Sequence, residues 1–281
     1  MDEAAADALR SEIRRLGPWH HDIELASGIR TGEISRSQDY PDTFGETSII
    51  DPRRNLAAIV QSVFPGGLGG RSFLDCACNA GGYVFAAAEM GAGRGFGFDV
   101  REHWIAQARL LSRYLPGPDI SFATCALADL PALRLEPFDV TLFSGIFYHL
   151  PDPVTGLRLA ADHTRELLIV NTAIRLGHSE GLQLNQESRT DVMSGVEGLA
   201  WFPTGDRVVR EILAWCGFPH TRLDFRRVGG NGFGRIQIFA ARNEETFAHY
   251  DRHRAAVPDR RRPLLKRVLR KIGNTALAMS R

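Results

Sequence analysis

Short apolar runs of strand length alternate with longer segments of helical spacing in the central part of the chain. The expected strands are "RSFLDCA", "RGFGFDV", "DISFATCA", "FDVTLFSGIFY" and "RELLIVNTAI". The expected helices are "YVFAAAEMGA", "REHWIAQARLLSRYL" and a segment from about residue 152 to 163. Strands that alternate with helices in this way predict a mostly parallel sheet that is covered by helices on both faces.

The alternation is interrupted by a polar insertion over residues 175–203. Thr204 then carries a side chain suited to capping a helix over "GDRVVREILAWCGF", which Gly217 would close. Two strands flank a glycine-rich turn in "TRLDFRRVGGNGFGRIQIFAAR", a pattern typical of an antiparallel hairpin. We therefore expect an α/β fold with a doubly wound, Rossmann-like, seven-stranded sheet, because a TIM barrel needs eight βα units.

The N-terminal part differs from the rest in its patterning. Residues 3–16 have the spacing of a short amphipathic helix, whereas residues 17–50 are polar and broken by Gly and Pro. The latter hold too few apolar repeats for a core element, so we expect a lid. Asp51 and Pro52 are a helix cap and a first-turn proline, which predict a helix over residues 51–64. The domain organisation that we expect is a helix and lid at 1–50, a sheet domain at 51–245 and a tail at 246–281.

Composition adds a few limits on the class of protein and its location. The chain of 281 residues is 44% hydrophobic and 24% charged, which suits one globular domain with additions. No stretch approaches the roughly 18 consecutive apolar residues of a membrane span, and the N-terminus has no apolar core of a secretory signal. The four cysteines lack a second closely spaced pair, which argues against a disulfide framework and favours a cytoplasmic location.

The tail is strongly basic. Residues 252–281 carry a net charge of +9, which leaves −8 for the rest of the chain. Residues 260–279 place Leu and Ile on one helical stripe with Lys and Arg beside it, as in a basic amphipathic helix. Such a helix can lie at the inner membrane surface, dock on a partner or on the body of the protein, or bind RNA. The tail lacks interleaved aromatic residues for base stacking, which weakens the RNA alternative.

The stretch "LDCACNAGGY" follows the first expected strand and has three possible interpretations. Cys76 and Cys78 resemble half of a metal site, but a zinc site needs about four ligands and no second pair exists. We therefore expect no metal and interpret both cysteines as small apolar groups. A dinucleotide site would need G-x-G-x-x-G after a strand, whereas "GAGRGFG" precedes one.

The third interpretation is a loop that holds another nucleoside. It places backbone N–H groups at the carboxyl end of the first strand, where glycines allow close approach of a ligand. About 20 residues further along, Asp99 ends the next strand, and its carboxylate can accept bonds from both hydroxyls of a ribose. The alternative for Asp99 is a cap for the following helix.

The ordered set "FLDCACNAGGYVFAAAEMGAGRGFGFDV", "CALADLP" and "FDVTLFSGIFYHLPDP" resembles the class I S-adenosylmethionine (SAM) dependent methyltransferases over residues 70–242. Within that superfamily, "GIFYHLPDP", "LAWFPTGDRVVREILAWCGF" and "PWHHDIELASGIRTGE" resemble the group that includes the tRNA wobble-uridine carboxymethyltransferase. That enzyme uses carboxy-SAM, which extra basic residues hold in its N-terminal part. Here we expect ordinary SAM as the cofactor.

The resemblance implies a set of cofactor-binding residues. The glycine loop contributes Asp75, Cys76, Ala77, Cys78, Asn79, Ala80, Gly81 and Gly82. The end of the second strand contributes Asp99 and Val100, the loop after the third strand contributes Ala126 and Leu127, and the fourth-strand motif contributes Ser144 and Gly145. The family often has an acid at the position of Ala126. Its absence leaves adenine recognition to the backbone N–H or to Asp129.

Tyr148 and His149 follow the fourth strand, on the rim where a doubly wound sheet binds its ligands, and are our catalytic candidates. Methyl transfer from a sulfonium needs in-line attack, so the enzyme mainly supplies proximity and orientation. An oxygen acceptor must also lose its proton, and a histidine base suits that step. The alternative is that His149 only shapes the pocket.

Candidates for acceptor binding lie on the lid and the insertion. They are Trp19, His20, His21, Trp201 with Phe202, and Arg189 with Asp191. The alternatives are ordinary lid contacts for the histidines, a hydrophobic staple for Trp201 and solvated loop charges for Arg189.

Together these features predict a SAM-dependent methyltransferase that acts at oxygen on a small polar acceptor, such as a sugar, a glycan precursor or a secondary metabolite. A tRNA-modifying (carboxy)methyltransferase is one alternative, although the acidic body argues against it. A SAM-binding protein without methyl transfer is another.

Overall fold

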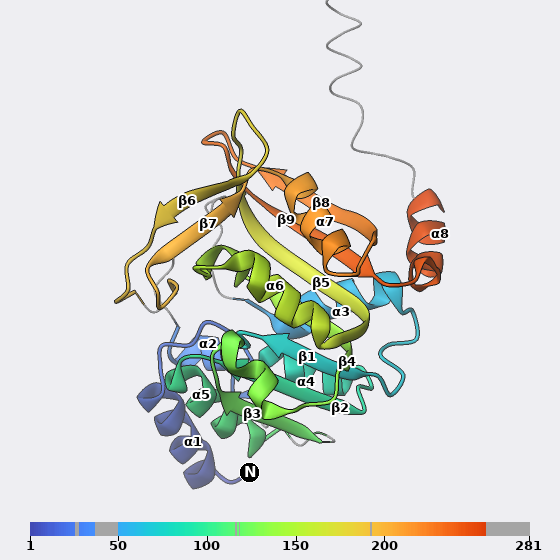
Figure 1. The fold of residues 1–281 in the computed structure, drawn as a ribbon. Helices are drawn as coiled ribbons and strands as arrows, with labels where there is room; N and C mark the ends of the chain where they lie inside the picture. The colour runs from blue at the N-terminus through green and yellow to red at the C-terminus, as the bar shows by residue number, and fades with distance from the viewer. Residues whose placement is uncertain (26–27, 37–49, 116, 118, 192, 257–281) are drawn as a thin grey trace, which may run out of the picture.

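The computed structural model describes residues 1–25, 28–36, 50–115, 117, 119–191 and 193–256. Its centre is a seven-stranded sheet in the order β3-β2-β1-β4-β5-β9-β8 (Figure 1). The strands are β1 Ser72–Cys76, β2 Arg94–Asp99, β3 Ile120–Thr124, β4 Phe138–Ser144, β5 Thr164–Arg175, β8 His220–Val228 and β9 Phe233–Ala241. The first five run parallel, and β9 is antiparallel to both of its neighbours, so the expected fold class is confirmed.

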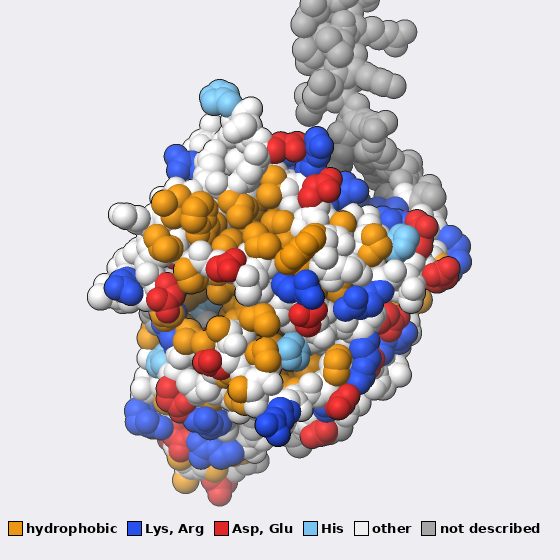
Figure 2. All heavy atoms as spheres, viewed as in Figure 1, with side chains coloured by type: hydrophobic (Ala, Val, Ile, Leu, Met, Phe, Trp, Pro, Cys, Tyr) orange, Lys and Arg blue, Asp and Glu red, His pale blue; other side chains and the backbone are white. Residues whose placement is uncertain are grey.

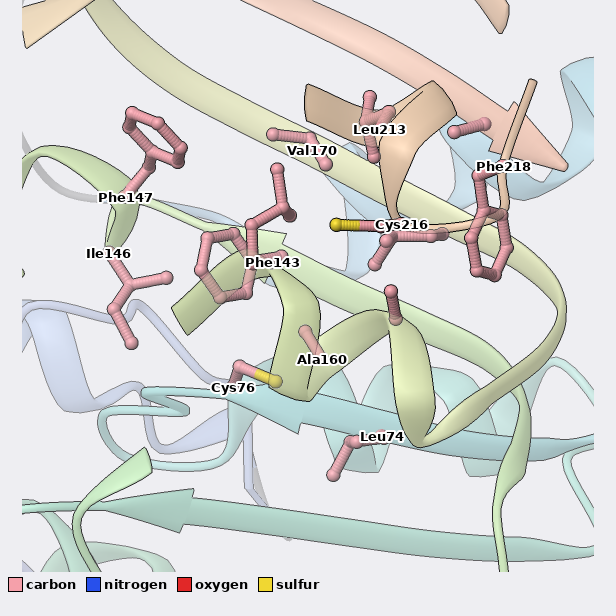
Figure 3. Packing of buried hydrophobic residues seen from close by; sticks show 14 of the residues in the cluster. Leu74, Cys76, Phe143, Ile146, Phe147, Ala160, Val170, Leu213, Cys216 and Phe218 are labelled. Carbon is pink, nitrogen blue, oxygen red and sulfur yellow. The ribbon is translucent and has the colours of Figure 1, made fainter. Parts of the chain in front are cut away.

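Helices cover both faces of the sheet because its central strands are apolar on both sides. On one face lie α3 Pro52–Val63, α4 Gly82–Glu89 and α8 Ala248–Ala256. On the other lie the 3-10 helix η2 Leu127–Leu133 and the α-helices α6 Pro153–Asp162 and α7 Asp206–Trp215. Figure 3 shows this second layer, where Leu74, Cys76 and Phe143 of the sheet meet Ala160 and Leu213. Adjacent residues such as Phe73 and Leu74 are buried in opposite layers, as the strand geometry requires.

The helix boundaries agree with the capping signals, with one exception. Asp51 and Asp152 each accept a bond from a first-turn N–H, at 2.9 and 3.0 Å, and each is followed by proline. Gly217 closes α7 with a φ of +87°. Thr204 does not cap that helix, because its Oγ1 accepts from the N–H of Gly181 at 2.9 Å. The N-cap residue is Gly205, which has no side chain to offer.

The described part of the lid contributes to the core, which corrects our expectation that it holds too few apolar residues. Trp19 is 0% exposed and packs with Ile23 and Leu25 against α1 Glu3–Arg15 and α5 Glu102–Ser112. The indole N–H donates to the carbonyl of Ile13 at 2.8 Å. These apolar residues have no helical or strand period, so periodicity does not reveal them. Residues 37–49 of the expected lid lie outside the described residues.

One buried amide holds the lid segment to the sheet domain. Gln107 on α5 donates from Nε2 to the carbonyls of Leu16 and Pro18, at 2.7 and 2.9 Å. These bonds pair backbone acceptors of an irregular segment that would otherwise be buried without partners. A short helix, α2 Thr31–Ile34, follows.

The insertion forms a small sheet of its own. β6 Leu182–Gln186 pairs antiparallel with β7 Leu199–Pro203, and both lie beyond the carboxyl end of β5 (Figure 1). On the face seen in Figure 2, hydrophobic side chains gather around this hairpin, and the surface below it is hollowed. Leu184 and Leu199 are among the exposed apolar residues of the hairpin. The hairpin thus overhangs the edge of the sheet where ligands bind in this architecture.

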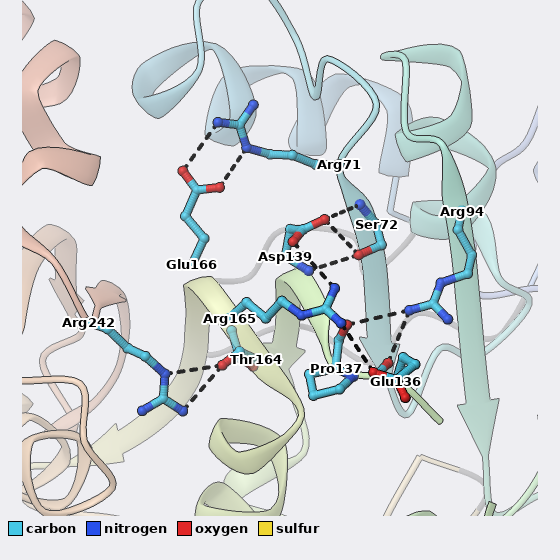
Figure 4. A network of polar contacts seen from close by, with 10 residues as sticks. All are labelled: Arg71, Ser72, Arg94, Glu136, Pro137, Asp139, Thr164, Arg165, Glu166 and Arg242. Atoms are coloured by element: carbon cyan, nitrogen blue, oxygen red, sulfur yellow. Dashed lines mark hydrogen bonds and ion pairs between the residues drawn. The ribbon is translucent and has the colours of Figure 1, made fainter. Parts of the chain in front are cut away.

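The opposite, amino edge of the sheet carries a network of ion pairs and hydrogen bonds (Figure 4). Arg71 forms a two-point pair with Glu166, and Asp139 accepts bonds from the N–H and hydroxyl of Ser72. Partly exposed pairs of this kind contribute about 0–1 kcal/mol each. Their position far from the carboxyl edge indicates a structural role.

The predicted basic helix at 260–279 lies outside the described residues, so its three alternatives stay predictions. No helix in the described part of the chain is long and apolar enough to cross a membrane.

Candidate cofactor and acceptor site

The loop after β1 has an unusual backbone that curls it toward β2. Ala77, Asn79 and Gly81 have φ values of +58°, +52° and +75°, in the left-handed region. For the two non-glycine residues this conformation costs about 1 kcal/mol or more, and such strain clusters at ligand sites. Asn79 offsets part of it, because its Oδ1 accepts from the N–H of Ala80 at 2.7 Å.

The two glycines of the loop are required by neighbouring protein atoms. A Cβ on Gly81 would lie 2.4 Å from the ring of Phe122, and one on Gly82 would lie 2.5 Å from Pro52 and 2.8 Å from Nδ1 of His21. The sequence interpretation explained both glycines by the approach of a ligand. The structure adds a reason within the protein, since the lid and α3 pack directly onto this turn.

Asp99 ties the loop to the end of β2. Its side chain is 6% exposed and accepts from the N–H groups of Asn79 and Arg101, at 3.1 and 3.0 Å. Burial raises the pKa of Asp99, while these N–H donors act in the opposite direction. The N-cap of α5 is Arg101, so Asp99 is not the cap residue of that helix.

Asp75 is a buried carboxyl group that lacks a hydrogen bond at one oxygen. It is 2% exposed, and among the described residues Oδ2 has no partner. Burial raises the pKa of Asp75 well above its usual range, and the nearby Asp99 adds to this effect. A buried unpaired oxygen costs about 1–3 kcal/mol, which a ligand with N–H donors would offset.

Cys76 and Cys78 are buried free thiols. Burial raises the pKa of both well above the usual range, and the charge of Asp75 adds to this. Such thiols are protonated at neutral pH and pack as small apolar groups.

Next to this polar loop, the ends of β2 and β3 offer an apolar surface. Val100 is 42% exposed despite its apolar side chain, whereas Leu127 is buried. The N–H of Cys125 donates to the carbonyl of Asp99 at 2.9 Å, which holds the two strand ends together. An exposed valine beside a carboxylate suits a ligand that has a flat base and a hydroxylated sugar.

His149 forms a pair that the sequence did not predict. Its Nδ1 lies 2.7 Å from Oε2 of Glu187, and both side chains are largely buried. The ring of Tyr148 lies 4.1 Å from that of His149 and stacks on Phe202 at 5.5 Å. Because neighbouring residues of a strand face opposite sides, Phe202 rather than Trp201 reaches Tyr148.

A second group of residues collects where β9 meets β5. Arg235 donates from Nε to Oδ1 of Asn171 at 2.6 Å, and its Nη2 lies 3.5 Å from the position of a Cβ on Gly145. Burial, together with the charge of Arg235, lowers the pKa of His20 to about 4. Burial and the neighbouring His20 lower the pKa of His21 to about 3, so both rings are neutral near pH 7.

The part of the chain that carries this site matches a known protein family. A family model described as "Methyltransferase domain" matches residues 69–205. Residues 69–205 therefore form a methyltransferase domain. The residues present fit SAM as a cofactor, because the unpaired Oδ2 of Asp75 offers a buried acceptor to an ammonium group.

Sequence relatives of this methyltransferase are named tRNA U34 carboxymethyltransferase. That of Ectopseudomonas mendocina is 29% identical over 230 residues, 79% of this chain and 62% of the relative. That of Pseudomonas putida is 34% identical over 161 residues, 57% of this chain and 45% of the relative. The chain thus spans about half to three fifths of the length of these curated relatives.

Solved structures confirm the methyltransferase fold. The N-terminal domain of EvdMO1 with S-adenosylhomocysteine (SAH) bound has a TM-score of 0.69 at 18% identity, covering 86% of this chain and 97% of that one. The bifunctional kinase-methyltransferase WbdD has a TM-score of 0.53 at 18% identity, covering 83% and 46%.

The structure brings some of the predicted acceptor residues of this methyltransferase together and separates others. His20 and His21 lie at the carboxyl edge together with the catalytic candidate His149. Glu187 and Arg235, which no sequence signal indicated, lie beside His149 and His20. Trp19 is a core residue and not an acceptor contact, which corrects that prediction.

Two further predicted acceptor contacts already have partners in the structure. Trp201 donates from its indole to the carbonyl of Pro151 at 3.0 Å. Arg189 is exposed and lies 4.0 Å from Glu197. Their contact with an acceptor stays a prediction.

Proposed function

We propose that the chain transfers the methyl group of SAM to a hydroxyl oxygen of a small polar acceptor. The observation that carries this proposal is the His149–Glu187 pair at the end of β4, with Nδ1 and Oε2 2.7 Å apart. Because Nδ1 is hydrogen-bonded to Glu187, Nε2 is the ring nitrogen that remains to accept a proton. A hydroxyl group is a poor nucleophile until its proton is removed, and a positioned histidine typically contributes 10²–10⁴-fold.

The remaining residues of the site hold and orient the ligands. SAM supplies an electrophilic methyl group on a positively charged sulfur. The loop at 75–82 would hold its methionine part, and Asp99 would accept bonds from its ribose hydroxyls. Val100, Ala126 and Leu127 would flank its adenine. Ser144 and Gly145 would lie beneath the transferred group, where the insertion excludes water.

The shape of the acceptor side favours a compact acceptor. Tyr148 and Phe202 form an aromatic wall on one side of His149, and the β6–β7 hairpin overhangs the site. The EvdMO1 domain has also been crystallised in the presence of SAH and D-fucose. Sugars and sugar-containing precursors are therefore the first acceptors to screen.

The test is an acceptor panel with isotope-labelled SAM, followed by kinetics of His149→Gln. We expect kcat to fall by about 10²–10⁴-fold with SAH affinity unchanged, because the base does not hold the cofactor. His178→Gln is the matched control, since His178 is an exposed histidine of the same insertion. Undiminished transfer by His149→Gln would remove the proposed base.

Arg235 favours a second candidate, transfer from carboxy-SAM as in a tRNA-modifying enzyme. A permanent positive charge beside a site for a positively charged ligand indicates that one of the ligands carries an anionic group. The names of the sequence relatives point the same way. Calorimetric titration of wild type and Arg235→Gln with SAM and carboxy-SAM decides between the two. A preference for carboxy-SAM that Arg235→Gln abolishes would support this candidate, and equal or stronger SAM binding would eliminate it.

A further inference from the structure

We propose that Glu187 is a positioning residue that holds the ring of His149 in the tautomer with its proton on Nδ1. This inference rests on the proposed function, in which His149 accepts a proton from the acceptor. The pair joins two parts of the chain that are 38 residues apart, the loop after β4 and the insertion. The insertion would then complete the catalytic site in addition to covering it.

The hydrogen bonds around Glu187 determine the position of the proton. An ionised carboxylate only accepts bonds, so a neutral imidazole 2.7 Å from Oε2 must donate through an Nδ1–H group. The same Oε2 accepts from the N–H of Gly195 at 2.8 Å, which fixes the carboxylate in turn. The Glu187 side chain is 11% exposed, so water competes little for this bond. With Nδ1 protonated, the lone pair of the ring is on Nε2.

Close packing keeps the segment that carries Glu187 against His149. A Cβ on Gly195 would lie 2.4 Å from the carbonyl oxygen of His149 and 3.1 Å from its Cβ, so only glycine fits without a shift. This contact and the bond to Glu187 hold the insertion to the loop after β4 at two points.

A second anchor connects the insertion to the cofactor side. Arg101 donates from Nη2 to the carbonyls of Asp191 and Ser194, at 3.0 and 2.8 Å. Arg101 also gives its own N–H to Asp99. The insertion therefore spans from the end of β2 to the end of β4, and in this position Glu187 reaches His149.

The test is a measurement of the His149 tautomer that does not depend on knowing the acceptor. The full chain is labelled with ¹⁵N at histidine and studied with bound SAH at a pH where the ring is neutral, and His149→Gln assigns the resonances. We expect the Nδ1–H form to dominate in wild type. Glu187→Ala removes the acceptor, and the ratio of Nδ1–H to Nε2–H should fall by about tenfold or more.

Two further variants separate positioning from a structural role. Glu187→Gln keeps an acceptor oxygen without the charge, so its tautomer ratio should lie between those of wild type and Glu187→Ala. Glu197→Ala removes a carboxylate of the same insertion that pairs with Arg189, and should leave the ratio unchanged. With an acceptor from the panel, Glu187→Ala should lower kcat by about 10–100-fold, with KM for SAM within about twofold.

An unchanged ratio in both Glu187 variants, with SAH still bound, would overturn the inference. Failure of the proposed function gives a different result, since His149→Gln would then methylate normally whatever the tautomer. The bound SAH also shows that each variant is folded, so a ratio measured in Glu187→Ala or Glu187→Gln bears directly on the hydrogen bond.

Discussion

Residues 75–100 supply most of the cofactor side of the site, whereas the acceptor side is assembled from four separate segments. On the cofactor side, a loop and the following strand end are linked by backbone bonds such as that from Asn79 to Asp99. On the acceptor side, His20, His149, Glu187 and Arg235 come from the lid, the β4 loop, the insertion and β9. The cofactor side is therefore a local motif, and the acceptor side exists only in the folded chain.

Because the cofactor side is a local motif, we expect single substitutions there to change the affinity for SAH. Asp99→Ala should weaken SAH binding by about 10–100-fold, since lost charge-assisted bonds cost roughly 1.5–3 kcal/mol. Asp162→Ala, at an exposed carboxylate of α6 that pairs with Arg158, is the control and should bind normally. Calorimetric titration measures both. A Kd within threefold of wild type for Asp99→Ala would show that the carboxylate does not hold the ribose.

On the acceptor side, the buried histidines should make the protein sensitive to acid. The folded pKa of His20 is about 4 and that of His21 about 3, below the ordinary value of 6.5. The unfolded chain therefore binds more protons below about pH 6.5, and stability falls as pH falls toward 4. Because of each histidine, the free energy of unfolding should fall by about 2 kcal/mol between pH 7 and pH 5.

Urea unfolding at both pH values checks this expectation. The variants His20→Gln and His21→Gln should each be less sensitive to pH than wild type, because glutamine does not titrate. Parallel pH dependence in wild type and both variants would show that the rings are accessible to protons in the folded state.

The last prediction concerns the contact between the cofactor side and the lid. Gly82→Ala should cost about 1–3 kcal/mol, because its Cβ would lie 2.5 Å from Pro52 and 2.8 Å from His21. Gly66→Ala is the matched control, since a Cβ there has nothing within 4 Å and φ is ordinary. Thermal or urea unfolding compares them. Equal stability of the two variants would mean that the lid shifts freely on the loop.

Much of the fold was predictable, because the signals are local. The burial of a strand such as β1 or β4 leaves a short, mostly apolar segment, and the caps Asp51 and Asp152 act within one helical turn. Thr204 shows the limit of such signals. Its hydroxyl had two possible partners, and the strand pairing of the insertion gave it the distant N–H of Gly181 instead of a helix end.

The acceptor side was predictable only in part, because its contacts depend on tertiary structure. His149 stood out through the motif that follows β4, but nothing near it in the chain indicated Glu187. Arg235 lies in a strand whose alternation predicts only a hairpin. Trp19 is an acceptor candidate through its place on the lid beside His20 and His21, yet the indole is fully buried and its N–H donates to the carbonyl of Ile13.

By itself, the sequence determined the parallel sheet, the loop at 75–82 and the acid at the end of β2, since these depend on short-range burial and backbone geometry. Only the tertiary structure decided which side chains share the acceptor side. The register of β9 against β5 pairs Arg235 with Ala173, so that its side chain reaches Asn171 two residues along β5, and the insertion places Glu187 on His149. A hydrogen bond between distant segments requires the donor and acceptor to be placed to within a few tenths of an ångström. Packing sets that distance, and sequence spacing does not encode it.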